Sequence, residues 1–321
     1  MTQLISPLAA LVVLACAFSA SACVAQSEFT GEQMPYQAFD TLSAQDLIVG
    51  GAKLHVAFAP GDFTLPKERL LAWIEKSAKA VATYYGRFPV ASARVLIVPI
   101  EGRGARGGQA FGYRGAAVRL LVGRASTEDD LVRDWKAVHE MIHLALPDVE
   151  ENHTWLSEGL AVYIESISRV QAGDLSPQKI WGEFVRDMPN GLPEAGDNGL
   201  DFTHTWGRTY WGGAIFALLA DIEFRKQTGN KKGLQDAMRG VIAANGSLQI
   251  NWPIERVLAV ADKAGGATVL SDLYQSLRAT PGDQDLDALW RDLGVAVSGD
   301  NVTFDDRAPL AAIRQAITKR P

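Results

Sequence analysis

Apolar and polar residues follow a strand-like and then a helical rhythm in the first part of this 321-residue chain. Leu54, Val56 and Phe58 are apolar at every second position, which predicts a half-buried strand. A helical pattern covers residues 66–85 and ends at a glycine. The run at 94–100 is almost continuously apolar, which is typical of a strand in the centre of a sheet. These elements predict a mixed α/β sheet.

Further along the chain the pattern becomes mainly helical. Two short strands at 108–114 and 117–123 predict a hairpin. One helix is then expected from Ser126 or Thr127 to Leu146, where a proline follows. Later helices are predicted at 157–171, 176–187, 207–228, 231–244, 253–264, 268–278, 284–293 and 308–318.

This change of pattern predicts an α+β fold with two lobes. Residues 46–147 form an N-terminal mixed α/β sheet lobe, and residues 148–321 form a mainly helical lobe. Residues 24–45 show no clear period and are expected to be an irregular leader. The Gly-, Pro- and Asp-rich connection at 188–205 has the length of a functional loop that could gate a cleft.

Composition narrows the class of partner. Apolar residues make up 47% of the chain and charged residues 21%, which is ordinary for a globular protein. The net charge is −6, and no block of Lys and Arg stands out. We therefore expect no nucleic-acid-binding surface.

The N-terminus has the pattern of an export signal. Residues 1–22 contain a short apolar run that ends in Ala20-Ser21-Ala22, an A-x-A-type cleavage site. Residues 21–23 also resemble the end of a bacterial lipobox, in which Cys23 would carry a lipid. The other cysteine, Cys16, lies inside the signal, so the mature chain has no internal disulfide. We expect a periplasmic, secreted or envelope-anchored protein whose one link to a membrane would be that lipid.

Residues 139–143 read HEMIH, which is an HExxH motif. On a helix, His139 and His143 lie on one face, so both imidazoles can reach a single metal ion. Two neutral imidazoles suit Zn²⁺, and a catalytic zinc needs a third protein ligand and an open position for water. Glu140 is placed to take a proton from that water. The motif predicts one zinc ion per chain.

The residues after the motif restrict the third ligand. A metzincin would have a histidine six residues after His143, where this chain has Val149. His153 lies ten residues after His143, a spacing that fits no familiar HExxH class. Glu158 lies near the start of the next predicted helix, from which its carboxylate could face the ion.

Residues 155–163, WLSEGLAVY, resemble the segment that supplies the third zinc ligand in gluzincin peptidases. The likeness is greatest to aminopeptidase N and the glycyl aminopeptidases, whose W-L-x-E-G-x-A-x-Y sequence binds zinc through its glutamate. The resemblance implies a thermolysin-like catalytic domain with His139, His143 and Glu158 as zinc ligands. It also implies Glu140 as the general base.

Residues 208–214, RTYWGGA, resemble the stretch of the same family in which a tyrosine donates a hydrogen bond to the oxyanion. The resemblance implies this role for Tyr210, although Gly212 replaces the usual lysine. His204 is a further candidate for the oxyanion or the cleft rim.

The family also has a G-x-M-E-N strand before HExxH, whose glutamate binds the free amine of a substrate. The corresponding strand here contains Gln109, Ala110 and Phe111 and has no acidic residue. We expect these three residues to hold substrate along the strand edge.

Together these features predict an exported zinc metallopeptidase that hydrolyses peptides or proteins, with endopeptidase activity favoured over aminopeptidase activity. One alternative is a catalytically silent, zinc-stabilised envelope protein that binds a peptide or protein partner. Another is hydrolysis of a non-peptide amide or ester, which the motif also permits.

Overall fold

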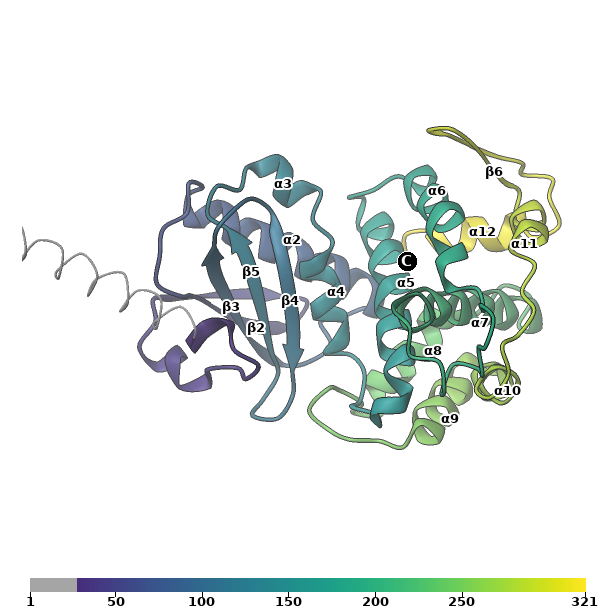
Figure 1. The fold of residues 1–321 in the computed structure, drawn as a ribbon, viewed down its shortest axis with the longest axis horizontal. Helices are drawn as coiled ribbons and strands as arrows, with labels where there is room; N and C mark the ends of the chain where they lie inside the picture. The colour runs from purple at the N-terminus through teal and green to yellow at the C-terminus, as the bar shows by residue number, and fades with distance from the viewer. Residues whose placement is uncertain (1–27) are drawn as a thin grey trace, which may run out of the picture.

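The computed structural model describes residues 28–321, and its architecture has two parts. A mixed five-stranded sheet lies at one end of the molecule and a group of helices at the other (Figure 1). The predicted α+β fold, a sheet lobe followed by a helical lobe, is confirmed. The predicted signal peptide at 1–22 and the lipobox cysteine Cys23 lie outside the described residues.

The sheet has the strand order β1-β2-β3-β5-β4. β2, β3 and β5 run parallel, and the edge strands β1 and β4 pair antiparallel to their neighbours. β3 lies in the centre, as its apolar sequence predicts, and β4 and β5 form the predicted hairpin. The bounds are β1 Ala44–Val49, β2 Ala52–Phe58, β3 Ser92–Ile100, β4 Ala105–Phe111 and β5 Ala117–Gly123.

Strand β1 is absent from our sequence prediction. It joins β2 through a tight turn at Gly50 and Gly51, and both glycines have positive φ angles of 56° and 80°. Two glycines between two strand-like runs are a strong hairpin signal, because glycine adopts positive φ without strain. That signal marks β1 in the sequence.

Both faces of the sheet are covered. α2, Lys67–Tyr85, packs on one face and ends at Gly86 in the left-handed conformation. Residues 28–42 pack on the other face through an apolar cluster that includes Phe29, Met34, Tyr36 and Phe39. Residues 28–42 of the predicted leader thus contain a 3-10 helix at Tyr36–Asp40, and the apolar side chains of the cluster belong to the folded core.

A buried arginine fixes the leader to the sheet. Arg119 on β5 is 6% exposed, and its Nη1 donates to the carbonyl oxygens of Phe29, Gly31 and Gln33. Its Nη2 donates to the side chain of Gln109 on β4 over 2.8 Å. A buried guanidinium needs such acceptors, since a charge without them is costly to bury.

The single helix predicted from residue 126 or 127 to 146 is wrong. The chain instead forms α3, Glu128–Val132, and α4, Lys136–His143. The Asp134 carboxylate accepts a hydrogen bond from the amide of Ala137 over 3.0 Å, so a side chain replaces the backbone acceptor of a continuous helix. This break sets the start of the helix that carries the HExxH motif.

The second half is helical, as predicted, except for one short hairpin that the sequence analysis missed. None of the helices among residues 28–321 is long and apolar enough to cross a bilayer. The helices are α5 Thr154–Ala172, α6 Pro177–Asp187, α7 Gly213–Gln227, α8 Leu234–Ala243, α9 Ile254–Gly265, α10 Val269–Leu277, α11 Leu286–Leu293 and α12 Ala311–Thr318, and the hairpin is β6 Val295–Ser298 with β7 Asn301–Phe304.

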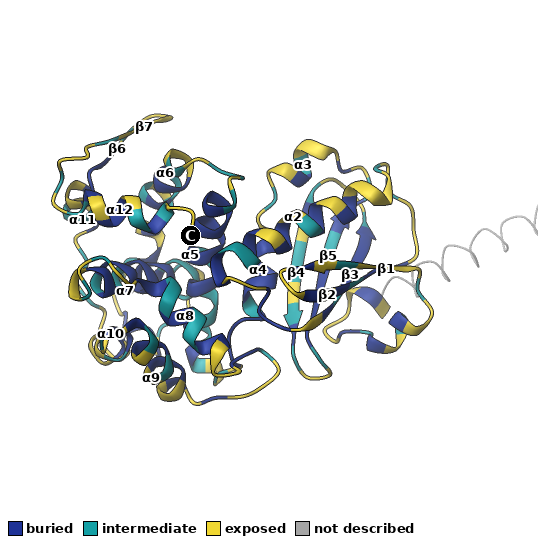
Figure 2. Ribbon diagram, turned by 180° about the vertical axis from the view of Figure 1, so that it is seen from behind, coloured by how far each residue is buried: buried dark blue, intermediate teal, exposed yellow. Residues whose placement is uncertain are grey.

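Helix α5 is the central element, and most of its residues are buried (Figure 2). It contacts α2 and α4 on the sheet side and α7 on the other. Gly159 of α5 lies against the backbone of Gly213 at the start of α7. A Cβ atom on Gly159 would lie 2.1 Å from the Gly213 carbonyl carbon, so the two helices meet backbone to backbone.

This contact generates a prediction about stability. Gly159→Ala should lower the free energy of unfolding by about 1–3 kcal/mol or more, because the new methyl group meets backbone that cannot rotate away. Urea denaturation followed by circular dichroism measures the change. Gly107→Ala is the matched control, since its Cβ would meet only Leu121 at an ordinary 3.5 Å. Equal stability of the two variants would contradict the close packing of α5 and α7.

Candidate metal centre

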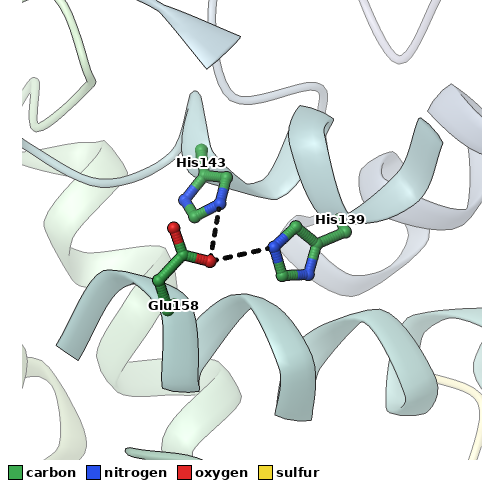
Figure 3. Close-up of side chains that lie close together, drawn as sticks. All are labelled: His139, His143 and Glu158. Carbon is green, nitrogen blue, oxygen red and sulfur yellow. Dashed lines mark hydrogen bonds and ion pairs between the residues drawn. The ribbon is translucent and has the colours of Figure 1, made fainter. Parts of the chain in front are cut away.

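Two helices bring three metal-binding side chains together. α4 presents His139 and His143 from successive turns, and α5 presents Glu158 from near its N-terminal end (Figure 3). One ligand atom from each residue lies within 4.8 Å of the other two. Among residues 28–321 this is the one group of three or more such side chains close enough to share an ion.

The spacing fits one zinc ion. Glu158 Oε2 lies 3.1 Å from His139 Nε2 and 3.5 Å from His143 Nε2. Two donors bound to one tetrahedral zinc at ordinary bond lengths are about 3.4 Å apart. Two imidazoles and one carboxylate are also a donor set typical of catalytic zinc, which keeps a fourth position for water. These residues therefore fit zinc in both spacing and chemistry.

The electrostatics of the three ligands favour a bound cation. Burial raises the pKa of Glu158, but hydrogen bonds to both histidines outweigh it and hold that pKa well below its usual range. Burial lowers the pKa of His139, which favours the neutral form that binds metal. Burial also opposes charge on His143, yet the carboxylate of Glu158 raises the pKa of His143 above its usual value. In the absence of metal, the raised pKa of His143 therefore favours its protonated form. Binding of a zinc ion would release that proton, because only the neutral imidazole is a ligand.

Glu140 points from α4 toward the edge strand β4. It is 9% exposed, and burial raises its pKa to about 7, with the negative charge of Glu158 adding to the rise. His143 and the backbone amide of Ala110 act in the opposite direction. A base with a pKa near neutrality accepts and returns a proton easily, and a bound cation would lower this pKa.

Gly108 on β4 makes room for Glu140. A Cβ atom at Gly108 would lie 2.5 Å from Cγ of Glu140 and 2.8 Å from its Oε1. β4 begins at Ala105, so Gly108 lies inside the strand. Gly108 is a site residue that the sequence analysis missed, and its signal is a glycine inside a strand pattern.

Tyr210 lies across the site from β4. It sits in a π-helix, Arg208–Gly212, that leads directly into α7. Its ring stacks with that of His139 at a centroid distance of 6.4 Å. Burial, followed by the charges of Glu158 and Glu140, raises the pKa of Tyr210 to about 12. The phenol therefore stays protonated and able to donate a hydrogen bond.

These residues line an open pocket of about 340 Å³, which we call the metal pocket. Its walls come from β4, α4, the first turn of α5 and Tyr210. The other lining residues are Thr154 and Ser157 at the start of α5, the residues Leu146, Pro147, Asp148 and Val149 between α4 and α5, and Leu248.

The predicted substrate residues on β4 divide between the two faces of the strand. Gln109 directs its side chain to Arg119 on the leader side, and Phe111 is buried in the leader cluster. Side chains alternate along a strand, so Gly108 and Ala110 face Glu140. Gln109 and Ala110 are among the residues that line the metal pocket, although the side-chain amide of Gln109 is engaged by Arg119, and Phe111 does not line the pocket.

The two other histidine candidates lie elsewhere. His204 is exposed, and the metal pocket, as formed by the described part of the chain, does not include it. His153 is buried, and its Nδ1 lies 3.0 Å from Oδ1 of Asp201. Asp201 also accepts from Trp155 Nε1 and Tyr274 OH at 2.9 Å. His153 thus belongs to a buried hydrogen-bond network around Asp201.

The connection at 188–205, predicted to gate the cleft, is tied to the π-helix. Arg208 is buried, and its Nε lies 2.7 Å from Oδ2 of Asp197. Its Nη1 donates to the carbonyl oxygen of Gly191 over 2.6 Å. These contacts hold the connection against the segment that carries Tyr210.

Comparison with solved structures supports the same architecture. The chain is similar to an aminopeptidase N family protein from Idiomarina loihiensis, with a TM-score of 0.61 and 18% identity, covering 80% of this chain and 50% of that one. The chain has the fold of the aminopeptidase N family. The predicted resemblance to gluzincin peptidases is thereby confirmed at the level of fold. The group formed by His139, His143 and Glu158 is arranged as in a gluzincin zinc site.

Other comparisons add less. A variant of an M1 zinc metallopeptidase from Deinococcus radiodurans, solved with a Tyr-Ser-Ala substrate, matches with a TM-score of 0.48 and 13% identity, covering 76% of this chain and 53% of that one. No family model and no curated protein sequence matches the chain. The chain spans about half the length of these two solved structures.

The geometry predicts how metal binding depends on its ligands. Glu158→Ala should lose bound zinc, because the two remaining imidazoles would hold the ion by two bonds instead of three. Zinc content after gel filtration, measured by atomic emission, should be near one per chain for the wild type and near zero for the variant.

A thermal melt provides a second readout. Added zinc should raise the melting temperature of metal-free wild type, since a ligand that binds only the folded state stabilises it. It should not raise that of Glu158→Ala. Glu150 is exposed in the segment between α4 and α5 and supplies the control. Glu150→Gln should bind zinc like the wild type. Full zinc content in Glu158→Ala would refute this ligand set.

Proposed function

We propose that the protein is an exported zinc metallopeptidase that hydrolyses peptide bonds. The single observation that carries this proposal is the grouping of His139, His143 and Glu158 with Glu140 and Tyr210 around one open pocket. A zinc site that served only stability would need neither the buried carboxylate of Glu140 nor a phenol held beside the ligands. The fold supports the same function by analogy.

The residues around the pocket divide the chemistry between them. When bound, zinc would polarise the scissile carbonyl and the attacking water. Glu140 takes a proton from that water and passes it to the leaving amine, and the burial that raises its pKa favours its action as a base. Tyr210 donates its hydroxyl hydrogen to the carbonyl oxygen as negative charge develops there.

Strand β4 supports a peptide as the substrate. It is an edge strand, so one side of its backbone has no partner strand in the sheet of the described chain. An extended peptide can pair with such an edge, and this pairing does not depend on peptide side chains. The side chain of Gln109 is engaged by Arg119, so the strand would hold substrate through its backbone.

The acidic residues of the pocket favour an endopeptidase. β4 carries no carboxylate to anchor a free amino terminus. Besides Glu140 and Glu158, the one carboxylate that lines the described metal pocket is Asp148, which is exposed. Aminopeptidase activity would therefore depend on Asp148, and Asp148→Asn would abolish it.

The proposal that the protein is exported rests on the signal-peptide pattern of residues 1–22.

The first test is cleavage of a mixed peptide library by the zinc-loaded protein, with products identified by mass spectrometry. Internal cuts are expected in the wild type. They should vanish in Glu140→Gln, whose zinc content should stay near one per chain because Glu140 is not a ligand. Loss of zinc together with activity would contradict the assigned role of Glu140.

Two other outcomes would change the proposal. Cuts confined to amino termini would establish an aminopeptidase instead of an endopeptidase. A zinc-loaded wild type that cleaves no peptide would favour a binding protein. Two departures from the family pattern agree with that alternative: Gly212 in place of the usual lysine, and the missing acidic residue on β4.

Tyr210→Phe tests the oxyanion donor. The variant keeps the aromatic ring that stacks on His139, so zinc content should not change. kcat should fall about 10²- to 10³-fold, the usual loss when one donor to a developing oxyanion is removed, while KM changes little. Steady-state kinetics on one peptide from the library measures both constants. An unchanged kcat would remove Tyr210 from the mechanism.

A further inference from the structure

A second, larger cavity opens beside the metal pocket. It has a volume of about 790 Å³, more than twice that of the metal pocket, and the two share His139 and Tyr210 as walls. We call it the aromatic pocket, and define it by Trp135, Val162, Phe184, Trp206 and Trp211. The mechanism above assigns no role to it.

The mouth of the aromatic pocket is formed by two exposed tryptophans. Trp135 is 43% exposed and packs edge-on against His139, with ring centroids 5.4 Å apart. Trp206 is 64% exposed and stacks on Tyr210 at 6.1 Å. Large apolar groups exposed at the rim of a cavity are typical of a surface that another molecule covers. Both tryptophans contact a residue of the metal site, so that surface is continuous with it.

The depth of the aromatic pocket contains paired charges. Glu165 and Arg169, one turn apart on α5, are both buried and form an ion pair of 2.5 Å. Nearer the surface, Lys179 Nζ lies 2.6 Å from Oε1 of Glu183. The charges of these two pairs compensate one another.

Two further lining charges are paired with residues outside the pocket: Asp174 with Lys76, and Arg133 with Asp130. The half-buried Asp187 is the one lining carboxylate without an ion pair among the described residues. Most of the charge in the wall is therefore paired, so selection of the substrate side chain rests mainly on the apolar walls.

Polar groups nevertheless remain in the wall. Ser166 lines the pocket beside Glu165, and its hydroxyl donates to Oε2 of Glu165. Hydroxyl and carboxylate oxygens of this kind can accept a hydrogen bond from a tyrosine hydroxyl or a tryptophan indole, which need a partner when buried.

We propose that the aromatic pocket takes a large aromatic side chain of the residue next to the cleaved bond, so that the substrates are peptides with Phe, Tyr or Trp at that position. This inference rests on the proposed peptidase function. A scissile carbonyl held between the metal ligands and Tyr210 places the adjacent side chain at the entrance that His139 and Tyr210 share. The apolar walls then favour an aromatic group, and the volume of about 790 Å³ admits even an indole ring.

The test compares two capped peptides, acetyl-Ala-Ala-Phe-Ala-Ala-amide and acetyl-penta-alanine-amide. Burial of a phenylalanine side chain should give the first a kcat/KM about 10- to 100-fold higher in the wild type. Cuts should fall on either side of Phe. A lysine peptide of the same length should resemble the alanine peptide, and a preference for lysine would overturn the proposal.

Val162→Phe narrows the pocket from α5, one helical turn after the ligand Glu158. The Phe-to-Ala ratio of kcat/KM should fall to within about threefold of unity in this variant, because the added ring occupies the space of the substrate ring. Val260→Phe is the matched control, since Val260 is also half-buried but lies on the remote helix α9. Its ratio should equal that of the wild type. A ratio that persists in Val162→Phe, or falls equally in both variants, would overturn the proposal.

Binding separates this inference from the proposed function. Zinc-loaded Glu140→Gln should bind the phenylalanine peptide at least tenfold more tightly than the alanine peptide in calorimetry. Adding Val162→Phe should remove that difference. If the wild type hydrolyses neither peptide but this difference in binding is found, the pocket assignment holds and the peptidase function fails. If neither hydrolysis nor a difference in binding is found, both fail.

Discussion

The backbone contact between Gly159 and Gly213 is the constraint on which the site depends. Gly159 directly follows the ligand Glu158, and Gly213 directly follows the π-helix that carries Tyr210. One close approach of two helices therefore sets how far the carboxylate ligand lies from the phenol. A side chain at either glycine would separate them, so the spacing of the site is built into the packing of the helical lobe.

A second close approach places the base. Glu140 can lie buried beside β4 because Gly108 has no side chain, and this burial raises the pKa of Glu140. The sheet lobe thus supplies the environment of the base, and the helical lobe supplies the third ligand and the phenol. The HExxH helix α4 lies between them and contacts both β4 and α5. The proposed chemistry therefore requires both lobes, because neither lobe holds all the residues of the site.

Much of this arrangement can be predicted from the sequence, and the failures have physical causes. Residues with a short-range signature, such as the i, i+4 histidines and the glutamate in WLSEGLAVY, come together as their spacing indicates. The break between α3 and α4 was missed because it depends on one Asp134 carboxylate that replaces a backbone acceptor. The direction of Gln109 was missed because its partner Arg119, opposite it on β5, is itself held by carbonyl oxygens of Phe29, Gly31 and Gln33. Contacts between residues so far apart in the sequence do not show in a local pattern.

The contacts of Arg119 also limit how far the chain could be shortened from its N-terminus without loss of stability. The Arg119 guanidinium is held by carbonyl oxygens of residues 29, 31 and 33, and the same group holds Gln109 on the edge strand. Proteolytic trimming into residues 29–33 would remove those acceptors and leave a buried charge beside β4. Cleavage at the predicted signal site after residue 22 spares them. Residues 29–33 are therefore not a disposable spacer, since they help to hold the strand that borders the metal pocket.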